Sequence, residues 1–197
     1  MTKQIQSFFA IVLSAFVLLA VAAPANAARV YNPDTNRWEE ATARTPGARQ
    51  SSIPRRLVDY STDLKVGTIV VETSERRAYL VLPDGKAMRY GVGVGRDGFR
   101  WSGTHRLTRK AEWPGWTPPA AMRRRQPELP AYMPGGPDNP LGARALYVGN
   151  TLYRLHGTSE PWTIGQAVSS GCIRLTNDDI IDLYDRVRVG ALIVVNQ

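Results

Sequence analysis

Short apolar runs separated by turn residues dominate the chain after residue 66 and predict a domain built mainly of strands. Gly67 to Val71 and Ala78 to Leu82 are rich in Val, Ile, Leu and Tyr, and Pro83-Asp84-Gly85 then gives a turn signal. Met88 to Val94 is the expected returning strand of this hairpin. Further strands are expected at residues 102–113, 145–148, 152–156 and 191–195.

One segment has helical periodicity. Apolar residues recur at helical spacing from Ile180 to Val187. Thr176 and Asp179 before them resemble a capping box, with an acidic residue where Glu or Gln is usual. Gly190 is expected to end the helix. The pattern as a whole predicts a β-rich domain with a small helical element.

Residues 114–142 are rich in proline and glycine and predict a long loop between two strands. A structureless loop of this length inside a compact domain is often functional, for example as a lid or a binding wall. Trp113 and Trp116 belong to this region and are either core residues or parts of a cleft wall.

Residues 1–27 have the pattern of an export signal. Lys3 is their only charge, Phe8 to Ala23 is an apolar run of sixteen residues, and Ala25-Asn26-Ala27 matches a cleavage site. A membrane-spanning helix needs about 20 residues, so an uncleaved anchor is the alternative. We therefore expect an exported protein of the periplasm or cell envelope, with no integral membrane span once the signal is removed.

The rest of the chain is expected to hold one domain behind a tether. Residues 28–60 lack a sustained period and carry several Pro, Gly and Ser residues, which predicts a flexible lead-in. Residues 61–197 are then the expected folded domain. The formal net charge of +8 could indicate nucleic-acid binding. However, the arginines are scattered and the chain has an export signal, so we expect the anionic cell envelope as its setting and no nucleic-acid partner.

The single cysteine, Cys172, is unexpected in an exported chain, because cysteines in an oxidising compartment normally form disulfides. It is either an inert core thiol or a thiol kept for chemistry. Cys172 follows His156 by 16 positions. A thiol reacts as its thiolate, and a neighbouring histidine can take the proton. His156 is thus the candidate base, and the carbonyl of Gly157 could accept its second ring N–H.

The residues around the cysteine also suit acyl transfer. Gly171 has no Cβ, so the backbone can approach a substrate carbonyl closely. The amides of Gly171 and Cys172 could form an oxyanion hole. Arg174 could bind a substrate carboxylate, or it could form a surface ion pair with Asp178 or Asp179.

These residues resemble the signature of a known family. His156-Gly157-Thr158, Ile164-Gly165 and Ser169-Ser170-Gly171-Cys172-Ile173-Arg174-Leu175 are similar to the motif of the L,D-transpeptidase catalytic domain, the YkuD-type family. The resemblance extends over roughly Val66 to Val195 and includes Asn139-Pro140-Leu141-Gly142 and the 113–119 segment. It implies a mainly β, β-sandwich-like fold with one or two short helices.

The resemblance also implies a reaction. The thiolate of Cys172 would attack the carbonyl after the third residue of a peptidoglycan tetrapeptide stem and release D-alanine. The amine of an acceptor stem would then resolve the thioester to give a 3→3 crosslink. In that family the cysteine is the nucleophile, the histidine is the acid/base and the carbonyl after the histidine orients it. Acylation of the cysteine by a carbapenem is expected on the same grounds.

Two alternatives stay open. The same acyl-enzyme could attach an envelope protein to peptidoglycan or hydrolyse such a link, because the acceptor is chosen by the loops. A non-catalytic wall-binding module would require Cys172 to be silent. Many family members have histidine where this chain has Ser170, so Ser170 is either a polar residue at the site or a small turn residue.

Other candidate residues give weaker signals. Trp162, Tyr147 and Met133 are candidate substrate-binding residues, although residues of these types more often pack in a core than contact a ligand. His105 is expected at the surface. One cysteine and two histidines without ligand spacing predict no metal site, and no cofactor is expected. The Gly93 to Gly98 run matches a dinucleotide-binding pattern, but a strand rather than a helix is expected after it.

Overall fold

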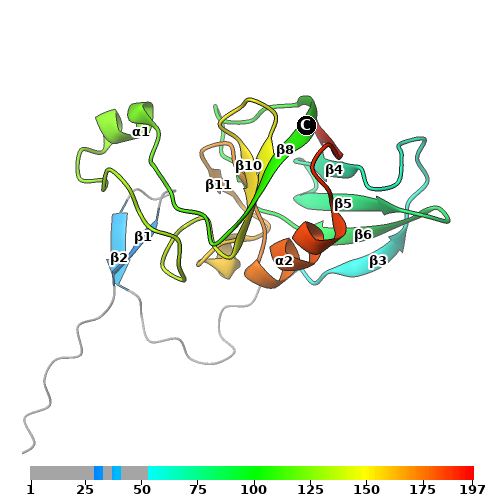
Figure 1. The fold of residues 1–197 in the computed structure, drawn as a ribbon, viewed down its shortest axis with the longest axis horizontal. Coiled ribbons are helices and arrows are strands. Elements are labelled where there is room, and N and C mark those ends of the chain that lie inside the picture. The colour runs from blue at the N-terminus through cyan, green and yellow to red at the C-terminus, as the bar shows by residue number, and fades with distance from the viewer. Residues whose placement is uncertain (1–28, 33–36, 41–52) are drawn as a thin grey trace, which may run out of the picture.

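The computed structural model describes residues 29–32, 37–40 and 53–197, and its main feature is a curled nine-stranded sheet (Figure 1). The strand order across the sheet is β12-β10-β9-β8-β13-β4-β5-β6-β3. The strands in chain order are β3 (Arg56–Asp59), β4 (Ile69–Glu72), β5 (Arg77–Leu82), β6 (Lys86–Gly91), β8 (Gly103–Glu112), β9 (Arg144–Val148), β10 (Arg154–His156), β12 (Ile173–Arg174) and β13 (Leu192–Asn196).

Smaller elements complete the fold. β7 (Val94–Gly95) and β11 (Ala167–Ser169) form a parallel pair, and β1 (Arg29–Asn32) and β2 (Arg37–Glu40) form an antiparallel pair. The helices are α1 (Ala120–Arg125) and α2 (Asn177–Arg186), with the 3-10 turn η1 (Pro161–Thr163). The described residues contain no helix with the length and apolar character needed to cross a membrane. The expected signal at residues 1–27 lies outside the described part of the chain.

The structure confirms the elements that depend on local sequence. β5 and β6 form the expected hairpin about Pro83-Asp84-Gly85, and α2 begins where the capping pattern places it. The side chain of Thr176 accepts a hydrogen bond from the Asp179 amide at 3.1 Å. The chain after the 93–98 glycine run continues into the long strand β8, as expected.

Two elements differ from the sequence expectation. α1 lies inside the predicted loop 114–142, where Ala120, Ala121 and Met122 are strong helix formers directly after Pro119. β3 lies before the expected domain boundary at residue 61 and pairs with β6, so it forms one edge of the main sheet. The segment 28–60 therefore contributes a strand to the domain.

The core lies between the curled sheet and α2. Leu146 of β9 and Leu155 of β10 are fully buried in one cluster with Ile180 and Leu183 of α2. This packing places α2 against β9 and β10. The N-terminus of α2 consequently lies close to the end of β10, where His156 is located.

A second, smaller core anchors the long loop. Trp116, Met122, Leu129 and Leu141 are buried together, and Met133 packs against them. The backbones of Trp116 and Met133 exchange two hydrogen bonds of 2.8 Å. Figure 1 shows α1 and this loop at the end of the molecule opposite β3 and β6.

Candidate active site

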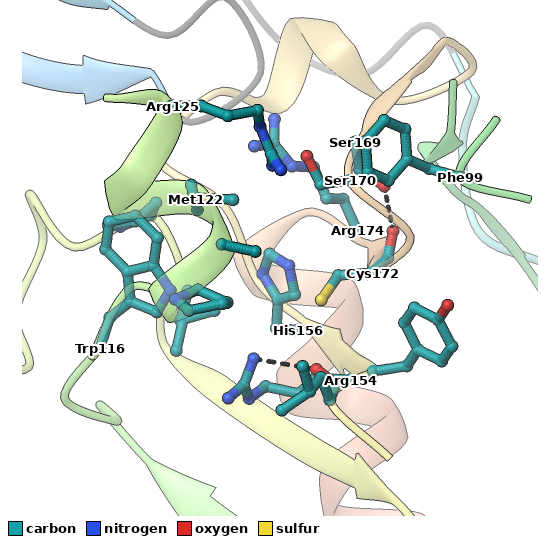
Figure 2. Close-up of a pocket in the computed structure, with 16 residues that line it drawn as sticks. Phe99, Trp116, Met122, Arg125, Arg154, His156, Ser169, Ser170, Cys172 and Arg174 are labelled. Atoms are coloured by element: carbon teal, nitrogen blue, oxygen red, sulfur yellow. Dashed lines mark hydrogen bonds between the residues drawn. The ribbon is translucent and has the colours of Figure 1, made fainter. Parts of the chain in front are cut away.

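Two adjacent strands bring His156 and Cys172 together. β10 ends at His156, and β12 begins one residue after Cys172. The two strands are parallel, with His156 paired to Arg174. In Figure 2 the sulfur of Cys172 faces the imidazole ring of His156. The sheet thus joins two residues that the sequence separates by a turn, η1 and β11.

These two residues line a cavity of about 360 Å³. One wall comes from β10 and the segment before β12, with Arg154, Ser169 and Ser170 in it. The other wall comes from α1 and its loop, with Trp116 and Met122 among the lining residues (Figure 2). The loop predicted to be a binding wall therefore forms one side of the cavity.

His156 is buried, with only 4% of its surface exposed. Its Nδ1 lies 2.5 Å from the carbonyl oxygen of Gly157, so Nδ1–H donates to that carbonyl and Nε2 is the acceptor nitrogen of the neutral ring. Burial, and then the nearby charge of Arg174, lower the pKa of His156 to about 3, while the Gly157 hydrogen bond opposes this shift. The imidazole is therefore neutral at pH 7.

The Gly157 carbonyl is held in place by tight packing. The Gly157 amide donates to the Arg144 carbonyl at 3.0 Å. A Cβ at Gly157 would lie 2.2 Å from Oδ1 of Asn177. That same oxygen accepts the Ala143 amide at 2.9 Å, which fixes its position. Only glycine fits here, and its carbonyl is consequently pre-set to orient the imidazole.

The backbone around Cys172 is fixed by side chains. Ser169 Oγ accepts the Gly171 amide at 3.1 Å and donates to the Cys172 carbonyl at 2.6 Å. The indole Nε1 of Trp101 donates to the Gly171 carbonyl at 2.6 Å. Within the described residues the Cys172 amide has no acceptor. Of the two amides expected to form an oxyanion hole, only that of Cys172 is therefore available.

Arg174 lies inside the protein and does not form the surface ion pair considered above. It is 2% exposed, and its Nη1 lies 3.2 Å from Oε2 of Glu160 and 3.4 Å from Oγ1 of Thr163. Glu160 is itself 3% exposed. The alternative of a surface pair with Asp178 or Asp179 is wrong, because Glu160, directly before η1, pairs with Arg174 instead. Arg174 still lines the cavity.

The other expected binding residues divide into two groups. Ser170 lines the cavity, whereas Trp162, Tyr147 and Met133 are not among its lining residues. Tyr147 stacks on Arg109, whose guanidinium carbon lies 3.6 Å from the ring centre. Met133 packs behind Trp116, which does line the cavity. His105, expected at the surface, is half-buried with its ring edge-on to Trp101.

Sequence reasoning missed several lining or supporting residues. Arg125 and Arg154 line the cavity, as do Tyr153 and Phe99. Nothing in their local sequence distinguishes them from other loop and strand residues. Ser169, in contrast, belongs to the Ser-Ser-Gly-Cys run, and its position beside the cysteine was a usable signal.

Comparisons with known proteins identify the family of the chain. The profile of the YkuD family, L,D-transpeptidase catalytic domain, matches residues 67–195. The probable L,D-transpeptidase ErfK/SrfK of Escherichia coli (strain K12) is 42% identical over 155 residues, which cover 74% of this chain and 48% of that protein. The chain thus spans about half the length of the curated relatives it matches.

Solved structures with the same fold include two that bear on this chain. A Brucella melitensis protein, described as a probable carnitine operon oxidoreductase, is 40% identical with a TM-score of 0.51, covering 72% of this chain and 92% of that one. L,D-transpeptidase 3 of Mycobacterium tuberculosis is 16% identical with a TM-score of 0.51, covering 67% and 61%. The latter likeness supports the fold.

Proposed function

Because the chain belongs to the L,D-transpeptidase catalytic domain family, we propose that it is a cysteine acyltransferase acting on peptidoglycan stem peptides. The observation that carries the proposal is the pairing of Cys172 and His156 in one cavity, with the imidazole oriented by Gly157. A thiol facing a neutral, oriented imidazole is the arrangement that nucleophilic catalysis requires.

The first half-reaction forms an acyl-enzyme. Nε2 of His156 accepts the thiol proton as the sulfur of Cys172 bonds to the carbonyl carbon after the third stem residue. The Cys172 amide stabilises the resulting oxyanion, a contribution of about 3–4 kcal/mol for one donor in other enzymes. The tetrahedral intermediate collapses, the C–N bond breaks, and His156 returns the proton to the amine of the leaving D-alanine.

The second half-reaction transfers the acyl group. His156 takes a proton from the amine of an acceptor stem, and that amine attacks the thioester. The C–S bond breaks, the sulfur recovers a proton and a 3→3 crosslink forms. The thiol and the neutral imidazole are thereby regenerated for the next cycle.

The charges that line the cavity suit an anionic peptide. Arg125 and Arg154 both line the cavity, and the chain as a whole is strongly basic. A tetrapeptide donor carries a free terminal carboxylate beside the scissile bond. Arginine binds carboxylates through paired donors, so these two residues are better candidates for substrate binding than Arg174, whose guanidinium pairs with Glu160.

The test is a muropeptide assay on residues 28–197. Purified disaccharide-tetrapeptide is the substrate, and mass spectrometry follows D-alanine release and dimer formation. Wild type and the control His105→Gln should give both products, and Cys172→Ala and His156→Ala neither. Absence of both products from wild type, or their persistence in Cys172→Ala, would refute the proposal. Release of D-alanine without dimer would instead indicate water or an envelope protein as acceptor. Localisation in the cell envelope is tested by fractionation of cells that produce the full chain.

A further inference from the structure

Several side chains hold the peptide unit between Gly171 and Cys172 in place. Gly171 is buried with a φ of +106°, in the left-handed region that favours glycine. A Cβ there would lie 2.5 Å from Cε1 of Tyr153 and 3.3 Å from the Phe99 carbonyl oxygen. Only glycine therefore fits at this position of the turn before the nucleophile.

Trp101 makes the hydrogen bond that sets the orientation of this peptide plane. Its Nε1 donates to the Gly171 carbonyl at 2.6 Å from a strand connection 70 residues away. The indole ring stacks on Tyr153 with ring centres 4.4 Å apart and planes 3° apart. Tyr153 in turn lines the cavity. The indole is thus fixed by stacking and points its one donor at the Gly171 carbonyl.

The geometry of the peptide bond links this contact to catalysis. In a trans peptide the C=O and the following N–H point in opposite directions, and the described residues contain no cis peptide bond. A Gly171 carbonyl directed at Trp101 therefore turns the Cys172 amide away from Trp101. The remaining polar groups of the two residues, the Gly171 N–H and the Cys172 C=O, are both bound by Ser169.

We propose that Trp101 is a positioning residue that orients the Cys172 amide as the oxyanion donor. The inference rests on the proposed function, because it concerns the acyl-transfer step at the same cysteine. Trp101 does not line the cavity and acts only through the Gly171 carbonyl. Without the indole donor, the peptide plane can rotate and the amide loses its alignment with the developing oxyanion.

The experiment compares two reactions of the same thiol. Acylation by meropenem passes through a tetrahedral oxyanion, whereas alkylation by iodoacetamide forms none, so only acylation depends on an aligned amide. Trp101 is replaced site-specifically by 3-benzothienyl-alanine, in which sulfur stands in place of the indole N–H and the ring stacking is kept. Trp101→Phe is the genetically encoded version. Trp162→Phe is the control, since Trp162 does not line the cavity and its replacement leaves the Trp101 donor intact.

Acylation of Cys172 is monitored by the mass of the intact protein, and its rate should fall by about 10- to 100-fold in both Trp101 variants. This is somewhat less than the loss of rate when an oxyanion donor is removed altogether in other enzymes. Alkylation should stay within twofold of wild type, and the Trp162→Phe control should acylate at the wild-type rate. With tetrapeptide, kcat should fall while KM changes little. Acylation of the benzothienyl protein at the wild-type rate would overturn the proposal. So would equal slowing of alkylation and acylation, which indicates general disruption of the site.

The two proposals fail separately. If wild type acylates with meropenem but does not process tetrapeptide, the proposed function fails, and the Trp101 variants still decide the positioning role by their meropenem rates. If wild type does not acylate at all, the acyl-enzyme and the role of Trp101 both fail.

Discussion

The buried neutral state of His156 predicts a specific dependence of stability on pH. In the unfolded chain a histidine binds a proton with a pKa of 6.5, whereas burial and the charge of Arg174 lower the pKa of His156 to about 3 in the folded protein. Between these values the unfolded state binds more protons than the folded state, so stability falls as pH falls. The contribution is complete above about pH 6.5 and is lost progressively toward pH 3.

The size of the effect follows from the two pKa values. Between pH 7 and pH 4.5 the free energy of unfolding should fall by about 2.5 kcal/mol on account of His156 alone. Because pH 4.5 lies well above the folded pKa of about 3, this figure depends mainly on the unfolded value of 6.5. His156→Gln removes the titrating imidazole. The difference in stability between wild type and this variant therefore separates the contribution of His156 from those of the carboxyl groups and of His105.

The assay is urea unfolding followed by tryptophan fluorescence at several pH values between 7 and 4.5. The stability of wild type relative to His156→Gln should fall by about 2.5 kcal/mol over this range. The matched control is His105→Gln, which removes the other histidine and leaves the His156 contribution in place. If the stability difference between wild type and His156→Gln changes by less than about 0.5 kcal/mol over this range, folded His156 titrates near its ordinary pKa and its burial does not lower that pKa.

Three further predictions concern single substitutions. Each is measured by urea unfolding, and the second also by D-alanine release. Arg174→Met removes the cation that is paired with buried Glu160 and should cost about 3–5 kcal/mol, against less than about 1 kcal/mol for Arg186→Met, which breaks an exposed pair. Equal losses would contradict the buried pairing. Gly157→Ala places a Cβ 2.2 Å from Oδ1 of Asn177 and should cost about 1–3 kcal/mol of stability. D-alanine release should fall by at least about tenfold, whereas wild-type activity would show that the carbonyl of residue 157 does not need this packing. Thr176→Ala removes the cap of α2 and should cost about 1 kcal/mol, whereas an unchanged midpoint would show that the cap contributes nothing.

The parts of the fold that depend on short-range patterns were predictable from the sequence. The hairpin about Pro83-Asp84-Gly85 and the start of α2 at Thr176 are both set by residues within one turn of each other. The order of strands was not predictable in the same way. β13 lies between β8 and β4, antiparallel to one and parallel to the other, and this placement depends on the burial of apolar faces far apart in the chain.

The candidate site also has a part that short-range sequence patterns predict and a part that depends on the fold. The motif around Cys172 identified the nucleophile and the base as candidates because both lie in short, distinctive runs. The carboxylate that pairs with Arg174 could not be predicted, because Asp178 and Asp179 are near in sequence but belong to α2, whereas the pairing residue Glu160 lies directly before η1. Trp101 could not be found, since its contact with Gly171 depends on the fold alone.

The low basicity of His156 constrains how the proposed reaction proceeds. Burial and the positive charge of Arg174 both penalise an imidazolium, so its formation requires compensating negative charge nearby. Attack of the sulfur on the carbonyl supplies that charge as the oxyanion forms, and the Gly157 carbonyl stabilises the imidazolium through Nδ1–H. Proton transfer and attack should therefore be coupled. The same burial makes the imidazolium a strong acid, which favours prompt protonation of the departing amine and hence collapse to the acyl-enzyme rather than return to substrate.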